Sequence, residues 1–188
     1  LLLSEIEINT SVCKDVNETI AELSELRNYV RSLGETLDYR IGMSGTHPTA
    51  KPEDQQFVEN NSYNWVSDQL HYYAARNITF ATHVHVAVAD GDTAVHVTNS
   101  LRQWIAPLLA LSANSPFYEG IYTHFKSART MQFGAFPRTN IPPYFKSYTH
   151  YEEMVANYLK IDSISKSRQI WWKLRPHMDF GTIEFRML

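Results

Sequence analysis

The chain has 188 residues, of which 44% are apolar and 20% are charged, and this composition excludes a disordered or fibrous protein. Its 17 basic and 20 acidic side chains give a net charge of −3, too acidic for a broad nucleic-acid-binding surface. The longest apolar run, residues 104–113, is interrupted by Pro107 and is too short to cross a bilayer. We therefore expect a protein that binds neither nucleic acid nor membrane.

The single cysteine, Cys13, excludes a disulfide scaffold and favours a reducing compartment, which we take to be the cytoplasm. Both ends of the chain have the pattern of β-strands, and the first residue is not methionine. Natural domains rarely begin and end inside strands, because an unpaired strand leaves its backbone donors and acceptors without partners. We expect residues 1–188 to form a single domain that is an incomplete segment of a longer one.

The N-terminal half is predicted to alternate between strands and helices. In chain order we expect a strand at 5–10, a helix between a capping box at Asp15 and Glu18 and a stop at Gly34, a strand at 37–43, a helix at 54–76 and a strand at 78–88.

The C-terminal half is predicted to contain two helices followed by two closing strands. In chain order we expect a helix capped by Asp92 that runs toward Asn114 with a kink at Pro107, a loop at 115–148, a helix at 151–161 behind a capping box at Thr149 and Glu152, and strands at 170–174 and 181–188. The short connection between the closing strands favours an antiparallel or mixed sheet.

Three of the predicted strands carry chemically reactive side chains on one face. Alternation places Glu7 opposite the isoleucines of its strand, and it places His83 and His85 opposite the valines of theirs. In the last strand, Glu184 and Arg186 share the face opposite the apolar residues. This pattern is also routine for a sheet with one solvent-exposed face, so each strand alone is ambiguous.

Taken together, these side chains predict a site for a divalent cation and a phosphate. Carboxylates and imidazole without thiolates favour Mg²⁺ or Mn²⁺, and a guanidinium beside a carboxylate holds a phosphate bidentately. Such a combination suits phosphoryl transfer, which depends on positioning and charge neutralisation. The chain contains no P-loop, kinase glycine loop or G-x-G-x-x-G motif.

The sequence resembles glutamate–cysteine ligase family 2, the carboxylate–amine ligases of the glutamine synthetase superfamily. The matching motifs span nearly the whole chain, and they are 7–13, 45–48, 83–86, 110–116, 127–129, 172–176 and 181–186. The resemblance implies an α+β fold with a curved, mainly antiparallel sheet that forms a catalytic funnel, with helices packed on the outer face. It also implies a homodimer and an ATP- and Mg²⁺- or Mn²⁺-dependent reaction that joins a carboxylate, typically that of glutamate, to an amine, typically that of cysteine, through an acyl phosphate.

The resemblance also implies a role for particular residues. The implied metal ligands are Glu7, His83 and Glu184; the implied catalytic arginines are Arg129, Arg175 and Arg186; and the implied cofactor- or substrate-binding residues are His47, His85 and Arg129. Arg129 could instead brace a loop, His47 could be a turn residue, and Arg175 could pair structurally with Asp179 or Glu184.

Two departures from the family pattern bear on activity. Ala87 and Val88 follow the histidine strand where glycine is usual, and Tyr122 stands where an acidic residue is expected. The family's first metal-binding strand also lies outside this chain, so the segment alone should not be a competent ligase. Two alternatives therefore remain open: a non-catalytic protein that binds metal or nucleotide, and a non-haem metalloprotein that uses His83, His85 and a carboxylate.

Overall fold

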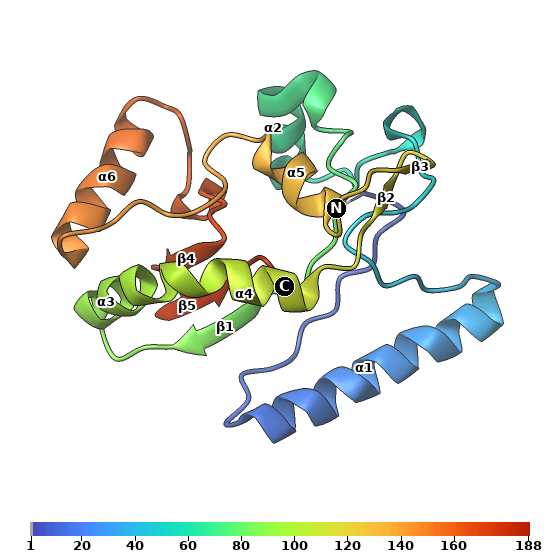
Figure 1. The fold of residues 1–188 in the computed structure, drawn as a ribbon, viewed down its shortest axis with the longest axis horizontal. Coiled ribbons are helices and arrows are strands. Elements are labelled where there is room, and N and C mark those ends of the chain that lie inside the picture. The colour runs from blue at the N-terminus through green and yellow to red at the C-terminus, as the bar shows by residue number, and fades with distance from the viewer. Residues whose placement is uncertain (1) are drawn as a thin grey trace. The chain divides into compact units, whose positions relative to one another are not determined.

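The computed structural model describes residues 2–188, with the exception of the side chains of residues 61–63. The chain divides into two compact units, Leu1–Met43 with Pro52–Ala75, and Ser44–Lys51 with Arg76–Leu188. Helices and short antiparallel sheets together make an α+β fold, which confirms the predicted class (Figure 1). The expectation of a single domain over residues 1–188 stays a prediction. Among the described residues, no helix is long and apolar enough to span a membrane.

The first unit contains one long helix and one short one. Helix α1 covers Val16–Leu37, and the Asp15 carboxylate accepts from the Glu18 amide at 3.0 Å, as the capping pattern predicted. The predicted stop at Gly34 is wrong, because the helix continues until Asp38 adopts a left-handed conformation with φ 54°. Gly34 is instead a buried position against which Tyr39 packs, and a Cβ there would lie 2.6 Å from the Tyr39 carbonyl oxygen.

Three other predictions in the first unit are wrong. The strands predicted at 5–10 and 37–43 do not form: residue 37 is the last of α1, and no described segment pairs with the other residues. The long helix predicted at 54–76 is reduced to α2 at Asn61–Leu70, between short 3-10 turns. Leu2 forms an isolated antiparallel bridge with Phe57 and is almost fully buried, so the N-terminal segment packs within this unit.

The second unit is built on a three-stranded antiparallel sheet in the order β1-β5-β4. Its strands are β1 at Val84–Ala87, β4 at Leu174–His177 and β5 at Thr182–Phe185. The antiparallel pairing was expected, but β4 begins where the predicted strand was to end, and β1 is much shorter than predicted. The apolar face of the sheet packs against α3 and α4 (Figure 1), and the core there contains Ala94, Ile105, Leu174, Ile183 and Met187.

The helices of the second unit begin and end at other residues than the sequence predicts. They are α3 at Gly91–Leu101, α4 at Ile105–Ser112, α5 at Ala128–Gly134 and α6 at Tyr148–Lys160. Asp90, not Asp92, caps α3, and Ser147, not Thr149, caps α6. Asp92 instead accepts from the Tyr148 amide at 3.3 Å and so joins the beginnings of the two helices.

The long helix expected from Asp92 to Asn114 is interrupted by a 3-10 turn at Arg102–Trp104, upstream of the expected kink. Pro107 lies in the first turn of α4, where a missing backbone N–H costs no helical hydrogen bond. The region predicted as loop at 115–148 contains α5 and a small hairpin, in which β2 at Phe117–Tyr118 pairs with β3 at Ile121–Tyr122.

Candidate functional site

The polar face of the three-stranded sheet brings together side chains from all three strands. The register places His85 opposite Glu184, and it places Glu184 opposite Arg175. In the next row, Thr182 lies between Ala87 and His177. Because antiparallel partners on one face lie about 5 Å apart, one row across the sheet joins a histidine, a carboxylate and an arginine.

Glu184 is the hub of this face. Its side chain is buried, and its Oε2 accepts from Arg175 Nε at 2.8 Å and also from Arg175 Nη2. Its Oε1 accepts from Arg186 Nη1 at 2.5 Å. Burial by itself raises the pKa of this carboxyl, but Arg186 and Arg175 outweigh burial and lower the pKa from 4.5 to about 2. Glu184 is therefore ionised across the physiological range.

Two imidazoles approach the same carboxylate. His83 Nδ1 lies 3.5 Å from Glu184 Oε1, and His85 Nε2 lies 3.8 Å from the same oxygen, while His85 Nδ1 contacts Thr182 Oγ1 at 2.9 Å. Burial, followed by the charge of Arg186, lowers the pKa of His83 to about 3. Burial also lowers the pKa of His85. Both rings are therefore mainly neutral at neutral pH.

The expected roles of His83 and Glu184 as metal ligands stay predictions. Over the described residues, no group of three or more His, Cys, Asp or Glu side chains is placed to hold a metal ion. The physical reason is visible at Glu184, whose two oxygens already accept hydrogen bonds from Arg175 and Arg186. The alternative iron site of His83, His85 and a carboxylate likewise stays open. Glu7 is an exposed residue of the other unit, so its role stays a prediction.

The three arginines named from the sequence differ in their partners. Arg175 is buried, and its guanidinium donates both to Glu184 and to the carbonyls of Arg168 and Ile170. This confirms the structural alternative of pairing with Glu184. Arg186 also contacts Glu184, whereas Arg129, from the first turn of α5, donates to the Arg186 carbonyl at 3.0 Å. The expected catalytic roles of all three stay predictions.

His47 lies in a turn of the second unit. Its Nδ1 accepts from the amides of Thr49 and Ala50 at 3.3 and 2.9 Å, and the residue is exposed. The ring therefore supports its own loop, as the turn interpretation allowed. The same loop holds the hairpin, because the Gly120 amide donates to the Pro48 carbonyl at 2.8 Å. Tyr122 is half exposed on β3, with its ring 5.4 Å from Phe117 and 4.6 Å from His124.

Sequence reasoning missed two residues of this face, His177 and Lys173. His177 stacks on Phe180 with ring centroids 4.2 Å apart and meets His85 edge to face. Lys173 precedes β4 and is buried, with its carbonyl accepting from the Arg186 amide at 2.8 Å. The alternation of Lys173, Arg175 and His177 around Leu174 and Pro176 was the signal that could have placed them on one face.

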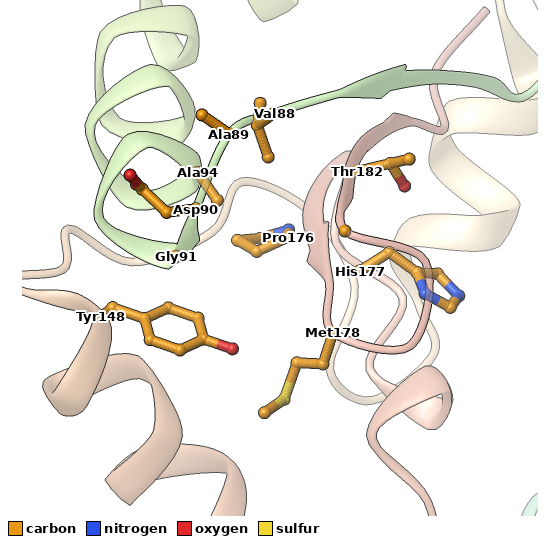
Figure 2. Close-up of a pocket in the computed structure, with 11 residues that line it drawn as sticks. Val88, Ala89, Asp90, Gly91, Ala94, Tyr148, Pro176, His177, Met178 and Thr182 are labelled. Carbon is orange, nitrogen blue, oxygen red and sulfur yellow. The ribbon is translucent and has the colours of Figure 1, made fainter.

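A pocket of about 120 Å³ lies at the end of the sheet where α3 and α6 begin. Figure 2 shows Asp90, Tyr148, Pro176 and Met178 around it, while the His177 ring points away from Tyr148 and Asp90. The His177 imidazole therefore belongs to the polar face of the sheet, although His177 is one of the residues that line the pocket. The Tyr148 ring passes close to Gly91, where any Cβ would overlap it.

The α+β fold is the class that the motifs of the sequence predicted. The family model for glutamate–cysteine ligase family 2 matches residues 1–188, and the chain belongs to this family.

Its relatives include proteins that carry the provisional name glutamate–cysteine ligase 2. The chain is 38% identical to the one from Solibacter usitatus over 184 residues, which is 98% of the chain and 48% of the relative. It is 38% identical to the one from Gloeobacter violaceus over 187 residues, which is all of the chain and 50% of the relative. It is 34% identical to the one from Thermobifida fusca over 187 residues, which is all of the chain and 47% of the relative. The chain thus spans about half the length of the curated relatives it matches.

Proposed function

We propose that the protein from its complete reading frame is an ATP-dependent carboxylate–amine ligase of the glutamate–cysteine type. Family membership over the whole chain is the observation that carries this proposal, and the provisional names of the relatives agree with it. In the proposed reaction, a carboxylate oxygen of glutamate attacks the terminal phosphorus of ATP, and ADP leaves. The amine nitrogen of cysteine then attacks the acyl carbon, phosphate leaves, and an amide forms with loss of one proton.

The cationic side chains on and beside the polar face support this proposal. Phosphoryl transfer needs charge neutralisation and positioning more than covalent chemistry. Arg129 and Arg186 would place guanidinium groups against phosphoryl or carboxylate oxygens, and Glu184 holds Arg186 in position at 2.5 Å. His85 and His47 would line the substrate side. The cation that accompanies ATP would be Mg²⁺ or Mn²⁺, and His83 and Glu184 are its proposed ligands on this face.

A second function is supported by the arginine pairs at Glu184. If Arg175 and Arg186 stay on the carboxylate, the polar face binds a substrate or nucleotide without turning it over, as a non-catalytic member of the family would. This alternative predicts binding of ATP without release of phosphate.

The deciding experiment is a phosphate-release assay on the purified protein from its complete reading frame. The ligase predicts phosphate release that requires ATP, L-glutamate, L-cysteine and Mg²⁺ together, and mass spectrometry should detect the amide product. Calorimetry with ATP covers the alternative: binding without turnover would establish the non-catalytic protein, and absence of both would overturn both proposals. We further propose a cytoplasmic homodimer, which light scattering and imaging of a tagged protein would test.

A further inference from the structure

Within the described residues, two largely buried cationic residues beside the polar face have no acidic partner. The side chains of Arg129 and Lys173 belong to residues that are only 7% and 8% exposed. Within the described part of the chain, Glu184 is the carboxylate in the ion pairs of this face, and its arginine partners are Arg175 and Arg186. Among the described residues, Arg129 Nε is buried without an acceptor, and no ion pair joins the Lys173 ammonium to a carboxylate.

The fold holds these two cations close to the same stretch of β5. Arg129 Nη2 donates to the Arg186 carbonyl at 3.0 Å, and the Arg186 amide donates to the Lys173 carbonyl at 2.8 Å. Arg129 is further fixed by Phe133, whose ring centroid lies 5.5 Å from the guanidinium carbon. Leu174 points into the core, so Lys173 lies on the opposite face, beside Arg186.

The charges of this face do not balance. Among the described residues, Arg175 and Arg186 pair with the carboxylate of Glu184, whereas no carboxylate pairs with Arg129 or Lys173. Burial, followed by the neighbouring Arg129, lowers the pKa of Lys173, and burial, followed by Arg186, lowers the pKa of Arg129 to about 10. A buried charge without a counter-charge is costly, and such charges are normally paired or bound to a ligand. The imbalance therefore indicates a missing anion.

We propose that Arg129 and Lys173 form a binding site for a small oxyanion, either a phosphoryl group or a carboxylate. The planar guanidinium offers parallel N–H donors to two oxygens, and the ammonium adds a point charge beside them. Arg175 is unsuited to this role, since its donors are used by Glu184, Arg168 and Ile170. The site gives Lys173 a function that the proposed ligase reaction does not assign to it.

The test is anion binding by the complete protein without nucleotide, divalent cation or turnover. Wild-type protein is titrated with inorganic phosphate and, separately, with acetate at constant ionic strength, by calorimetry and by thermal shift. We expect saturable binding, with affinity reduced about tenfold or more in Lys173→Met and kept in Lys173→Arg. Without anion, Lys173→Met should melt at a higher temperature than wild type, because a buried unpaired charge is gone. Lys146→Gln, at an exposed lysine of the same unit, is the matched control and should match wild type.

The two anions separate the two sources of the ligand. A response to phosphate alone assigns the site to a phosphoryl group, and a response to acetate alone assigns it to a carboxylate. Arg129→Lys keeps the charge but loses the planar fork, so it should also weaken binding if Lys173→Met does not fold. Equal anion affinity in wild type, Lys173→Met and Arg129→Lys, or no saturable binding to wild type, would overturn the proposal. Because no turnover is measured, loss of the ligase proposal would leave this result intact, and the reverse also holds.

Discussion

The Nε atom of Arg175 donates to Oε2 of Glu184 at 2.8 Å, and the two residues are direct cross-strand partners of β4 and β5. They are 5% and 2% exposed, so the ion pair is shielded from water. A buried pair gains little over an apolar pair of the same shape, but removal of one partner leaves an uncompensated buried charge. The pair therefore constrains which substitutions the sheet tolerates.

Replacement of Glu184 by glutamine should destabilise the protein by about 3–5 kcal/mol, because Arg175 and Arg186 would lose their shared carboxylate. Urea unfolding of wild type, Glu184→Gln, Arg175→Met and the double variant measures the coupling between the two residues. The double variant should be less destabilised than the sum of the single ones. Additive effects, or a Glu184→Gln variant as stable as wild type, would contradict a coupled buried pair.

Replacement of Arg186 by lysine in the complete protein should leave the fold intact and lower turnover by about 10²-fold, the scale found when one donor to a developing oxyanion is removed. Lysine keeps the charge but not the planar fork. The measurement is steady-state phosphate release beside a thermal melt, with Arg31→Lys at an exposed position of α1 as control. Wild-type turnover in a well-folded Arg186→Lys variant would remove the support for a phosphate-binding role.

Replacement of Gly91 by alanine should destabilise the protein by about 1–3 kcal/mol, the usual cost of overpacking. The new Cβ would lie 2.4 Å from Tyr148 Cγ, close to the ring's attachment point, so the ring cannot simply swing away. Gly42→Ala is the control, because nothing lies within 4 Å of its Cβ position. In a Tyr148→Ala background the cost of Gly91→Ala should largely vanish, and an unchanged cost would contradict the steric explanation.

The Asp90 cap of α3 should make the free energy of unfolding depend on pH in the acidic range. The Thr93 amide donates to the Asp90 carboxylate at 2.7 Å and lowers the pKa of this carboxyl below its ordinary 3.8. Because the pKa of Asp90 is lower in the folded protein than in the unfolded chain, the stabilisation by the ionised cap is complete above pH 3.8. This stabilisation is lost as the pH falls through the pKa that Asp90 has in the folded protein. Asp90→Asn keeps the cap without titrating. Urea midpoints of Asp90→Asn should fall less steeply than wild type below pH 3.8, and parallel curves would contradict this role for Asp90.

The helix caps show which local features the sequence predicts correctly and which it does not. Asp15 and Glu18 begin α1 as their spacing predicts, since both partners lie within one helical turn. The pattern predicted Asp92 as the cap of α3, whereas Asp90 is the residue whose side chain accepts from the helix. Asp92 instead accepts a hydrogen bond from the amide of Tyr148 in α6, a residue 56 positions away, and such a long-range contact cannot be predicted from local spacing.

The sequence by itself determined the family, the α+β class and the face on which the residues of β1 and β5 lie. The face is a local property, because successive side chains alternate across any strand, and Glu184 and Arg186 accordingly share one side of β5. Only the tertiary structure decided the partners on that face. The register set Arg175 opposite Glu184, and the path of α5 brought Arg129 to the Arg186 carbonyl. Charge balance depends on neighbours in space, so the excess of cations around Glu184 could not be read from spacing along the chain.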